Sequence, residues 1–454
     1  MENDPVQKNQ FRHFRRIVWG FFLFIFGVLL LTGAIYVPFI YESQTLRYHF
    51  GADRNLLLTG HIMGTTAAVL IFFQLILISR ITVLDRIFSI NRLHLLHRIN
   101  AILILSMALC HLLMILSILG SETLTPDIRQ WPEYTGLLLL IMLTGIVFSG
   151  FFRKYIHMPY NYWFFFHRIF APCVSLLLCV HVYFVSETFR YDNAHRLIII
   201  FIISCFLIYI LVRLKNSFFF RTACRITDIR MAGRLIHTLE LVPEKEQRII
   251  NVPGQFAFIK IKSGNISMEE HPFTISSTPT RPPVLQFTIR SSGDWTKKVP
   301  NLIMNDRVFI SGPFGIYGHL DLKSSRELIM IAGGIGITPM LSILRYLLDN
   351  KSDRKITLIW SNRTHEEVIY PDEFRSMENN MPNLDIQYLF TRETGDEEIT
   401  GRLDRNSLKI RLSGCSRRSV VLLCGPPKMM SRVKKDLLFL GFHRRSIITE
   451  RFSM

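Results

Sequence analysis

The sequence predicts a multidomain membrane protein. A six-helix transmembrane bundle is followed by an antiparallel β-barrel and then by an α/β domain with a doubly wound parallel sheet. Six apolar segments precede residue 215, alternating apolar and polar runs follow it, and strands alternate with helices from Glu327 onward. The N-terminal segment and the membrane, β and α/β domains are predicted at residues 1–16, 17–214, 222–325 and 326–454.

The six apolar segments are close to the length of about 20 residues that a helix needs to cross a bilayer. They are Ile17–Ile40, Leu56–Ser79, His94–Leu119, Tyr134–Phe152, Trp163–Val185 and Arg196–Leu214. Basic residues gather at one set of ends: Lys8, Arg12, Arg15, Arg16, Arg80, Arg86, Arg92, Arg153, Lys154, Arg213 and Lys215. The positive-inside rule therefore predicts a multi-pass membrane protein with both termini in the cytoplasm. The first segment lacks a clear cleavage site and is expected to be retained as a span.

The charge and cysteine content exclude two other classes of protein. Lys and Arg total 53 against 35 acidic residues, a formal charge of +18, which in a soluble chain would suggest nucleic-acid binding. Membrane topology already accounts for many of these cations, so no nucleic-acid partner is expected. The seven cysteines show no paired metal spacing, and none lies in a predicted exterior loop, so no disulfide framework is indicated.

Two of the predicted spans carry histidines at the same spacing of fourteen residues, His97 with His111 and His167 with His181. Fourteen helical steps return to within about 40° of the starting direction and rise about 21 Å. Each helix thus presents two imidazoles on one face, one near each side of the bilayer. Two imidazoles on opposite sides of an iron are the axial ligands of a low-spin haem. The pattern predicts two stacked haem sites, His97 with His167 and His111 with His181.

Other interpretations of these histidines are bonding between neighbouring helices and zinc binding. A zinc site brings its ligands to one point, and identical spacing on two helices has no packing explanation, so haem is favoured. Arg98 and Arg168 would pair with haem propionates or serve as interfacial cations, and the sequence leaves both open. For His61, His94 and His157, which have no matched partner, bonding to neighbouring helices is favoured.

The β-domain contains two fragments that suit a flavin nucleotide. HPFTISS, from His271 to Ser277, sets an aromatic ring and hydroxyl groups at a strand edge, as a flavin wall requires. Arg290 and the turn Gly293–Thr296 offer a cation, a flexible backbone and a hydroxyl, which are groups that bind a pyrophosphate. Each fragment alone is also typical of an ordinary β-turn.

The α/β domain contains a glycine loop, GGIGITPM, between a predicted strand and a predicted helix. Its glycines would let the backbone approach a pyrophosphate, with Thr338 as N-cap and Pro339 as the first helical residue. The segment Cys424–Pro427 ends a later strand at the carboxyl edge, where ligands bind in such sheets. The loop alone is also compatible with a simple tight turn.

The second strand of this domain ends in Trp360, Ser361, Asn362 and Arg363. We expect no carboxylate at this edge to hold a ribose 2′-hydroxyl, and an arginine suits a 2′-phosphate. NADPH is therefore favoured over NADH, although Arg363 would equally serve as a solvated loop residue.

Taken together, these motifs resemble the NADPH oxidase and ferric reductase superfamily over residues 10–454, in its minimal bacterial form. The motifs that carry this resemblance are the haem histidines His97, His111, His167 and His181, the flavin residues His271, Pro272, Phe273, Thr274, Ser277, Arg290, Gly293, Trp295 and Thr296, the glycine-loop residues Gly333, Gly334, Gly336, Thr338 and Pro339, and the segment Cys424, Gly425 and Pro426. Related reductases also place an aromatic residue over the flavin, two residues after a glutamate, and Glu450 and Phe452 match that arrangement.

The resemblance implies transfer of a hydride from NADPH, with NADH possible, to FAD. Single electrons would then pass through two haem b groups to extracellular or periplasmic O2 or a metal chelate. Cys424, Glu450 and Phe452 are the expected catalytic residues. Animal oxidases tend to place another histidine where this chain has Ile115. No EF-hand loop or proline-rich regulatory tail is found, so no regulatory subunit is implied, and the bacterial inner membrane is the expected location.

Two alternatives to an oxidase remain, a ferric or cupric chelate reductase and a haem-free transporter fused to a flavin reductase. O2 is favoured as acceptor because the predicted exterior loops are short and lack clustered Cys, Met or His. These loops are Tyr41–Asn55, Gly120–Glu133 and Ser186–His195. Arg47, Arg54 or His61 would stabilise superoxide as its charge develops.

Overall fold

A computed structural model describes residues 5–42, 51–79, 84, 88, 90–119, 131–153, 155–185, 200, 204, 207, 209–211, 221–245, 249–315, 317, 327–393 and 400–450. The chain forms two compact units. The helical unit is His13–Lys215, and the C-terminal unit is Asn216–Met454 together with Met1–Arg12.

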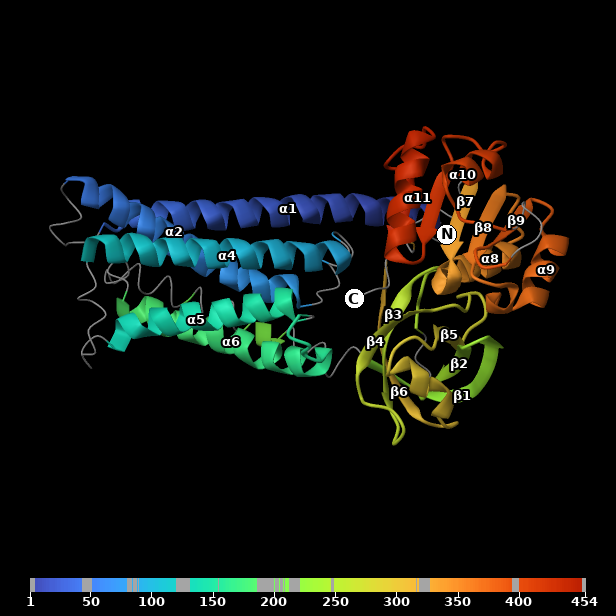
Figure 1. Ribbon diagram of the computed structural model, residues 1–454, viewed down its shortest axis with the longest axis horizontal. Helices are drawn as coiled ribbons and strands as arrows, with labels where there is room; N and C mark the ends of the chain where they lie inside the picture. Colours follow the sequence, from blue (N-terminus) through green and yellow to red (C-terminus); the bar gives the residue numbers. More distant parts are fainter. Residues whose placement is uncertain are drawn as a thin grey trace. The chain divides into compact units, whose positions relative to one another are not determined.

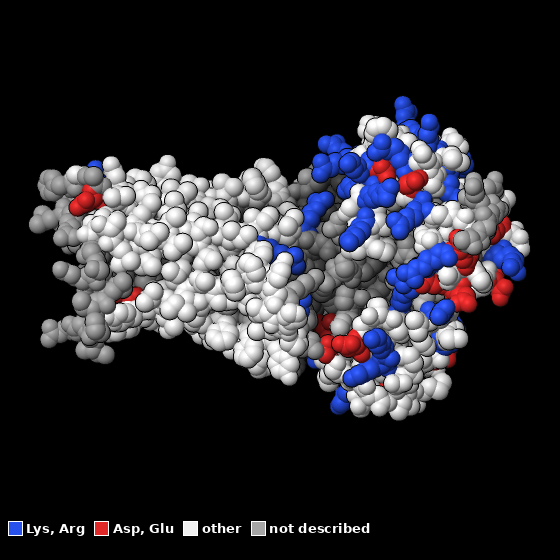
Figure 2. Space-filling view, viewed as in Figure 1, with Lys and Arg blue, Asp and Glu red and all other residues white. Residues whose placement is uncertain are grey.

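The helical unit consists of long apolar helices (Figure 1), which are α1 (Pro5–Ile40), α2 (Gly51–Leu77), α4 (Ile90–Leu119), α5 (Trp131–Phe152) and α6 (Tyr160–Val185). Within the described residues, five helices are long and apolar enough to cross a membrane. Of the sixth predicted span, only residues 200, 204, 207 and 209–211 are described, all helical, and the rest lies outside the described part. The visible face of these helices carries few charges (Figure 2).

These helices pack through apolar side chains and a few polar contacts. A cluster drawn from α2, α4, α5 and α6 fills their centre, formed by Ile71, Phe72, Leu75, Ile104, Leu139, Leu143, Val174 and Leu178. Gln74 and Asn100 tie α2 to α4, because the Gln74 amide donates to the His97 carbonyl at 3.0 Å and the Asn100 amide to the Leu70 carbonyl at 3.0 Å. Such hydrogen bonds stabilise a particular pairing of helices, because lipid tails are as apolar as the side chains and supply no hydrophobic driving force for association.

The β-domain of the C-terminal unit is one antiparallel sheet of six strands in the order β4-β3-β6-β1-β2-β5. The strands are β1 (Arg221–Gly233), β2 (Ile236–Pro243), β3 (Phe256–Lys262), β4 (Glu270–Thr274), β5 (Leu285–Arg290) and β6 (Arg307–Phe314). One isolated bridge, Ile275 to Phe287, joins the edges at β4 and β5, so no ladder closes the predicted barrel in the described residues. A buried cluster that includes Ile226, Leu239 and Phe287 forms its core.

The α/β domain has five parallel strands in the order β11-β10-β7-β8-β9. They are β7 (Leu328–Gly333), β8 (Ile356–Asn362), β9 (Leu384–Phe390), β10 (Val420–Cys424) and β11 (Ile447–Glu450). The helices are η8 (Gly334–Ile337), α8 (Thr338–Asp349), η9 (His365–Glu367), α9 (Pro371–Asn380), α10 (Arg405–Arg411) and α11 (Pro427–Phe439).

Apolar clusters cover both faces of this sheet, one with side chains of α8 and α9 and the other with side chains of α10 and α11. The doubly wound arrangement therefore agrees with the sequence prediction. The chain runs outward from β7 to β8 and β9 and then returns to β10 on the other side of β7. This reversal places a topological switch point between the carboxyl ends of β7 and β10.

Arg345 of α8 joins the two domains of the C-terminal unit. Its guanidinium forms a bidentate pair with Glu373 of α9, at 2.6 and 2.7 Å. It also donates to the Ser276 carbonyl at 2.8 Å and to the Gln286 side chain at 2.7 Å, both in the β-domain. Because only 8% of the Arg345 side chain is exposed, these bonds are made largely without competition from water.

Replacing Arg345 with methionine should destabilise the C-terminal unit by about 2 to 3 kcal/mol. Methionine keeps most of the packing volume but leaves Glu373 and the Ser276 carbonyl without their partner, and breaking a buried pair costs about 3 to 5 kcal/mol before allowance for the partly exposed Glu373. Urea unfolding of the full chain in detergent, followed by tryptophan fluorescence, measures the change. Arg281→Met is the control, since the Arg281 side chain is 61% exposed in its pair with Asp349, and it should cost less than about 1 kcal/mol. Equal losses in the two variants would contradict a joining role for Arg345.

Candidate functional site

The switch point of the α/β domain brings two glycine-containing loops together backbone to backbone. A Cβ atom at Gly336 would lie 2.5 Å from the Cys424 carbonyl oxygen, and one at Gly333 would lie 2.5 Å from the Met429 sulfur. Gly334 has φ +53°, a left-handed conformation that favours glycine. The loops after β7 and β10 thus meet at the carboxyl edge of the sheet, where the sequence predicts a pyrophosphate site.

The predicted N-cap role of Thr338 is wrong. The Thr338 hydroxyl donates back to the Ile335 carbonyl at 3.1 Å, and no side chain caps α8, because the single turn η8 intervenes between the strand and the helix. Pro339 is the second residue of α8, one position after the predicted one, because Thr338 is the first.

Cys424 is the last residue of β10, Gly425 and Pro426 follow it, and Cys424 pairs in register with Glu450 of β11. Both residues are buried, and the Tyr317 hydroxyl donates to the Leu423 carbonyl beside them at 2.8 Å. Burial, with the Glu450 charge, raises the pKa of the Cys424 thiol well above its ordinary value, so the thiol is neutral. Phe452, the third predicted catalytic residue, lies outside the described residues.

The carboxyl edge of β8 differs from the sequence prediction, because it does carry a carboxylate. Glu367 is buried in η9, and its Oε2 accepts the Arg363 N–H at 3.2 Å. The same carboxylate pairs with Arg290 of β5 at 2.5 Å. The Arg363 side chain is exposed at this edge. Asn362 is buried here, and both its amide atoms lack a hydrogen-bond partner within the described part of the chain.

Three of the predicted flavin residues of the β-domain, His271, Phe273 and Trp295, form an aromatic cluster. His271 and Phe273 of β4 lie 4.4 and 5.8 Å, between ring centroids, from Trp295. Trp295 is fixed by its indole N–H, which donates to the Ser267 carbonyl at 2.9 Å. Three aromatic rings thus lie beside the edge strand, where sequence reasoning expects a flavin wall.

The other predicted flavin residues are held by bonds within the protein. The Thr296 hydroxyl accepts the Ser292 and Gly293 N–H groups, each at 2.9 Å, and so caps its own turn. The Ser277 hydroxyl accepts the Gln286 N–H at 3.1 Å, and its carbonyl accepts the Ser342 hydroxyl at 2.8 Å. Pro272 and Thr274 pair with Phe258 and Phe256 of β3.

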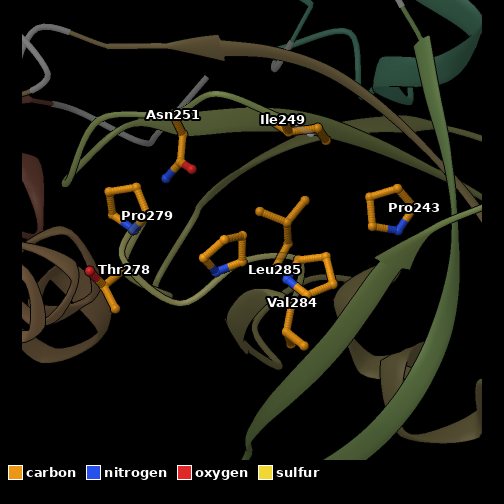
Figure 3. A pocket seen from close by; sticks show the side chains of 9 residues that line it. Pro243, Ile249, Asn251, Thr278, Pro279, Val284 and Leu285 are labelled. Atoms are coloured by element: carbon orange, nitrogen blue, oxygen red, sulfur yellow. The ribbon is translucent and has the colours of Figure 1, made fainter. Parts of the chain in front are cut away.

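Figure 3 shows a separate small pocket in the β-domain, lined by Pro243, Ile249, Asn251, Thr278, Pro279, Pro282, Pro283, Val284 and Leu285. Its volume is about 30 Å³, enough for one or two waters. A ligand pocket needs about 300 to 1,000 Å³. The pocket is too small for a nucleotide, and none of the residues that line it is among those predicted to bind one.

In the helical unit, His97 of α4 and His167 of α6 face each other, with ring centroids 6.1 Å apart. Two imidazoles that ligate one metal ion from opposite sides stand about 6 Å apart, because each metal–nitrogen bond is about 2 Å and each centroid lies about 1 Å further. Trp163 stacks on His167 at 5.1 Å and restricts that ring. Nδ1 of both histidines is buried without a hydrogen-bond partner among the described residues.

The outer histidines, His111 and His181, are each fixed through Nδ1. His111 Nδ1 lies 2.7 Å from the Gly60 carbonyl, and His181 Nδ1 lies 3.1 Å from the Thr135 hydroxyl. A histidine that ligates a metal commonly bonds its other nitrogen in this way, which orients the ring. The donor set of both pairs, and the ring separation of the inner pair, fit imidazole ligands of a haem iron.

Two helix glycines that sequence reasoning did not single out make room for these rings. A Cβ at Gly64 would lie 3.0 Å from His111 Nδ1, and one at Gly136 would lie 2.6 Å from His181 Cε1. Glycine inside an apolar helix signals close packing, so the sequence did contain a signal for them. It does not show which ring each glycine accommodates.

Comparison with known families assigns the chain three consecutive domains. Residues 63–178 match a ferric reductase like transmembrane component, residues 222–320 an FAD-binding domain, and residues 330–435 an oxidoreductase NAD-binding domain.

Similar curated proteins include sulfhydrogenase 2 subunit gamma of Pyrococcus furiosus, 29% identical over 44% of this chain and 70% of that protein. NADH-cytochrome b5 reductase 1 of Eremothecium gossypii is 30% identical over 35% of this chain and 57% of that protein. Among solved structures, the FAD/NAD binding domain of nitric oxide dioxygenase from Vibrio cholerae has a TM-score of 0.45. It is 19% identical and covers 51% of this chain and 99% of that domain.

These domains define an NAD(P)H-dependent oxidoreductase whose FAD- and NAD-binding modules follow a transmembrane component. The chain has the domain architecture of the NADPH oxidase and ferric reductase superfamily. The family resemblance inferred from the motifs is therefore confirmed.

Cys424 should resist alkylation in the native protein at pH 8.5. Its raised pKa keeps the thiol protonated, and only the thiolate reacts. Iodoacetamide labelling followed by peptide mass spectrometry should leave Cys424 unmodified until urea is added, while the half-buried Cys415 is labelled slowly. Rapid native labelling of Cys424 would show that its thiol is exposed and ionised.

Proposed function

We propose that this protein transfers electrons from cytosolic NADPH across a membrane to an acceptor on the outer face. We assign residues 17–214 to a six-helix haem domain, 222–325 to an FAD-binding β-barrel domain and 326–454 to a nucleotide domain. The observation that carries it is the 6.1 Å separation of the His97 and His167 rings, in a chain that also has FAD- and NAD-binding domains.

His97 with His167 would hold the inner haem, and His111 with His181 the outer haem. The Gly60 carbonyl and the Thr135 hydroxyl would orient the outer ligands. When bound, the haems would carry single electrons through a region where most side chains of the protein are apolar. That region includes Ile104 and Val174, each seven residues from both histidines of its own helix and each nearly fully buried.

FAD, when bound, would accept a hydride from the nicotinamide nucleotide and return its electrons one at a time. The cluster of His271, Phe273 and Trp295 would form a wall of its site. Cys424 and Glu450 lie together at the carboxyl ends of β10 and β11, where the neutral thiol would border the reacting rings without adding charge. Phe452 would cover the flavin.

The nucleotide would lie at the switch point, with its pyrophosphate against Gly333, Gly334 and Gly336. The unpartnered amide of Asn362 offers a buried donor and acceptor at the same edge. The exposed Arg363 suits a 2′-phosphate. Glu367 is the kind of carboxylate that holds a ribose 2′-hydroxyl, but it is already paired with Arg290, and this pairing favours NADPH, with NADH as the alternative.

The acceptor is proposed to be O2, reduced to superoxide. Around the outer histidines the structure places apolar and small groups, since Ile115 and Met114 both approach the Gly60 position within 3.4 Å. The Arg54 guanidinium lies 3.2 Å from Glu42, so its charge is partly neutralised. Such surroundings suit a small neutral acceptor better than a charged metal chelate.

The variant His111→Leu should contain one haem per chain where the wild type contains two, because only one axial pair remains. Pyridine haemochrome absorbance of the purified protein, divided by protein mass, gives the ratio. His61→Leu, which alters a histidine of α2 outside both pairs, should retain two haems. Two haems in the His111 variant would remove the proposed pairing.

The variant Arg363→Ala should raise the KM for NADPH about tenfold or more and change the KM for NADH little. Loss of one charge-assisted bond to the 2′-phosphate costs about 1.5 to 3 kcal/mol. Ferricyanide reduction with each nucleotide measures both constants. A similar rise in both would remove Arg363 from 2′-phosphate recognition.

The protein in liposomes, given NADPH, should reduce cytochrome c on the outside in a reaction that superoxide dismutase inhibits. Superoxide is the reductant only if O2 is the acceptor. A rate that dismutase leaves unchanged, together with rapid ferric citrate reduction under nitrogen, would instead support the chelate reductase.

A further inference from the structure

Arg290 of the β-domain and Glu367 of the α/β domain form an ion pair across the boundary between their domains. Arg290 Nη2 lies 2.5 Å from Glu367 Oε1, and Nη1 lies 3.5 Å from Oε2. The side chains are 22% and 10% exposed, so the pair is mostly shielded from water. A shielded pair of this kind fixes where the arginine charge stands.

The guanidinium of Arg290 also stands over the glycine loop. Its Nη1 lies 3.3 Å from the position that a Cβ atom would take at Gly334. Arg290 is therefore next to the backbone of the α/β domain's phosphate cradle, although it belongs to the β-domain. A pyrophosphate lying against Gly334 would come within reach of this cation.

Glu367 is held from two sides, by Arg290 and by the Arg363 N–H. Burial acts to raise the pKa of Glu367, but the bonds from Arg290 and the Arg363 N–H outweigh it and the pKa lies below its ordinary value. The carboxylate is ionised at neutral pH. Glu367 would still accept the Arg363 N–H if the Arg290 guanidinium moved away to bind another anion.

We propose that Arg290 is a ligand for the pyrophosphate of the incoming nicotinamide nucleotide, and that Glu367 is a positioning residue that holds the guanidinium at the glycine loop and competes with phosphate for it. This inference rests on the proposed nucleotide site at Gly333–Gly336. It gives Arg290 a role beyond the FAD pyrophosphate. The Arg290 guanidinium would then be affected by the ligands of both domains, because the pyrophosphate of the nicotinamide nucleotide must displace Glu367 from it.

Glu367→Gln separates the two effects of this residue. Glutamine keeps the length and an acceptor oxygen, so the guanidinium stays in place, but it removes the competing charge. The affinity for inorganic pyrophosphate, which has no ribose to contact residue 367, should rise about tenfold. Arg290→Gln should lower that affinity about tenfold, and Arg290→Lys should lower it less because a lysine retains the charge without the planar fork.

Isothermal titration calorimetry of the full chain in detergent, loaded with FAD, measures pyrophosphate binding without any turnover. FAD content from flavin absorbance and the circular dichroism melt are recorded for every variant, and Arg290→Lys keeps the test valid if Arg290→Gln does not fold. In the double variant that combines Arg290→Gln with Glu367→Gln, the second change should have no further effect on the pyrophosphate affinity, because the cation for which Glu367 competes is absent. Glu366→Gln is the matched control, since the neighbouring Glu366 pairs with Arg234 and is 52% exposed, and it should leave the affinity unchanged.

Weaker pyrophosphate binding by Glu367→Gln would overturn the competition, and unchanged binding by both Arg290 variants would overturn the whole inference. If the wild type binds no pyrophosphate but NADPH still bleaches the flavin, the inference falls and the proposed function stands. If NADPH neither binds nor bleaches the flavin, the proposed function falls as well.

Discussion

A lipid bilayer offers no partner to a polar side chain, and this constraint shapes the helical unit. Its helices are apolar on nearly every face, so each buried imidazole represents a free-energy cost that needs an explanation. The structure places His97 opposite His167 at a separation that suits a shared metal ion. It fixes the outer histidines through the Gly60 carbonyl and the Thr135 hydroxyl. Gly64 and Gly136 leave room for the outer rings. The contacts that pack the helices together therefore also determine where the histidine rings lie.

The C-terminal unit solves a different problem, because it must hold two nucleotides close together. The sheet order creates a switch point between β7 and β10, and the glycines there let the two loops meet. Arg345 and Arg290 then join the β-domain to the α/β domain through Glu373 and Glu367. The Arg345–Glu373 pair has the more deeply buried arginine, as suits a permanent contact between the domains. The Arg290–Glu367 pair lies at the glycine loop, where an incoming phosphate would compete with Glu367 for the arginine.

Much of this architecture could be predicted from local patterns. Apolar length located the five described spans within a few residues, and the alternation of strand and helix predicted the parallel sheet. The glycine loop and the Cys424 strand end could be located from the sequence because neighbouring residues determine both. The fourteen-residue histidine spacing likewise predicted that His97 and His167 would lie close together, since a helix repeats a face regularly.

The predictions that failed depend on short turns and on contacts between distant parts of the chain. Glu367 was missed as the carboxylate of the β8 edge because it lies five residues beyond the strand, and only the turn η9 brings it back. Its partner Arg290 is 77 residues away in the sequence. Because the short turn η8 precedes α8, Thr338 is the first residue of the helix and not its N-cap. The periodicity of apolar residues does not determine the exact residue at which a helix begins. Nor does sequence reveal that Gly60 and Thr135 anchor the outer histidines.

The central claim is that electrons pass from the C-terminal unit into haems held by the helical unit. Anaerobic addition of NADPH to the purified, FAD-loaded protein, followed by stopped-flow absorbance, tests it most directly. The account predicts flavin bleaching followed by the sharp absorption bands of reduced bis-histidine haem, with two haems reduced per chain. Flavin bleaching with no haem bands, in protein that retains its fold, would contradict it.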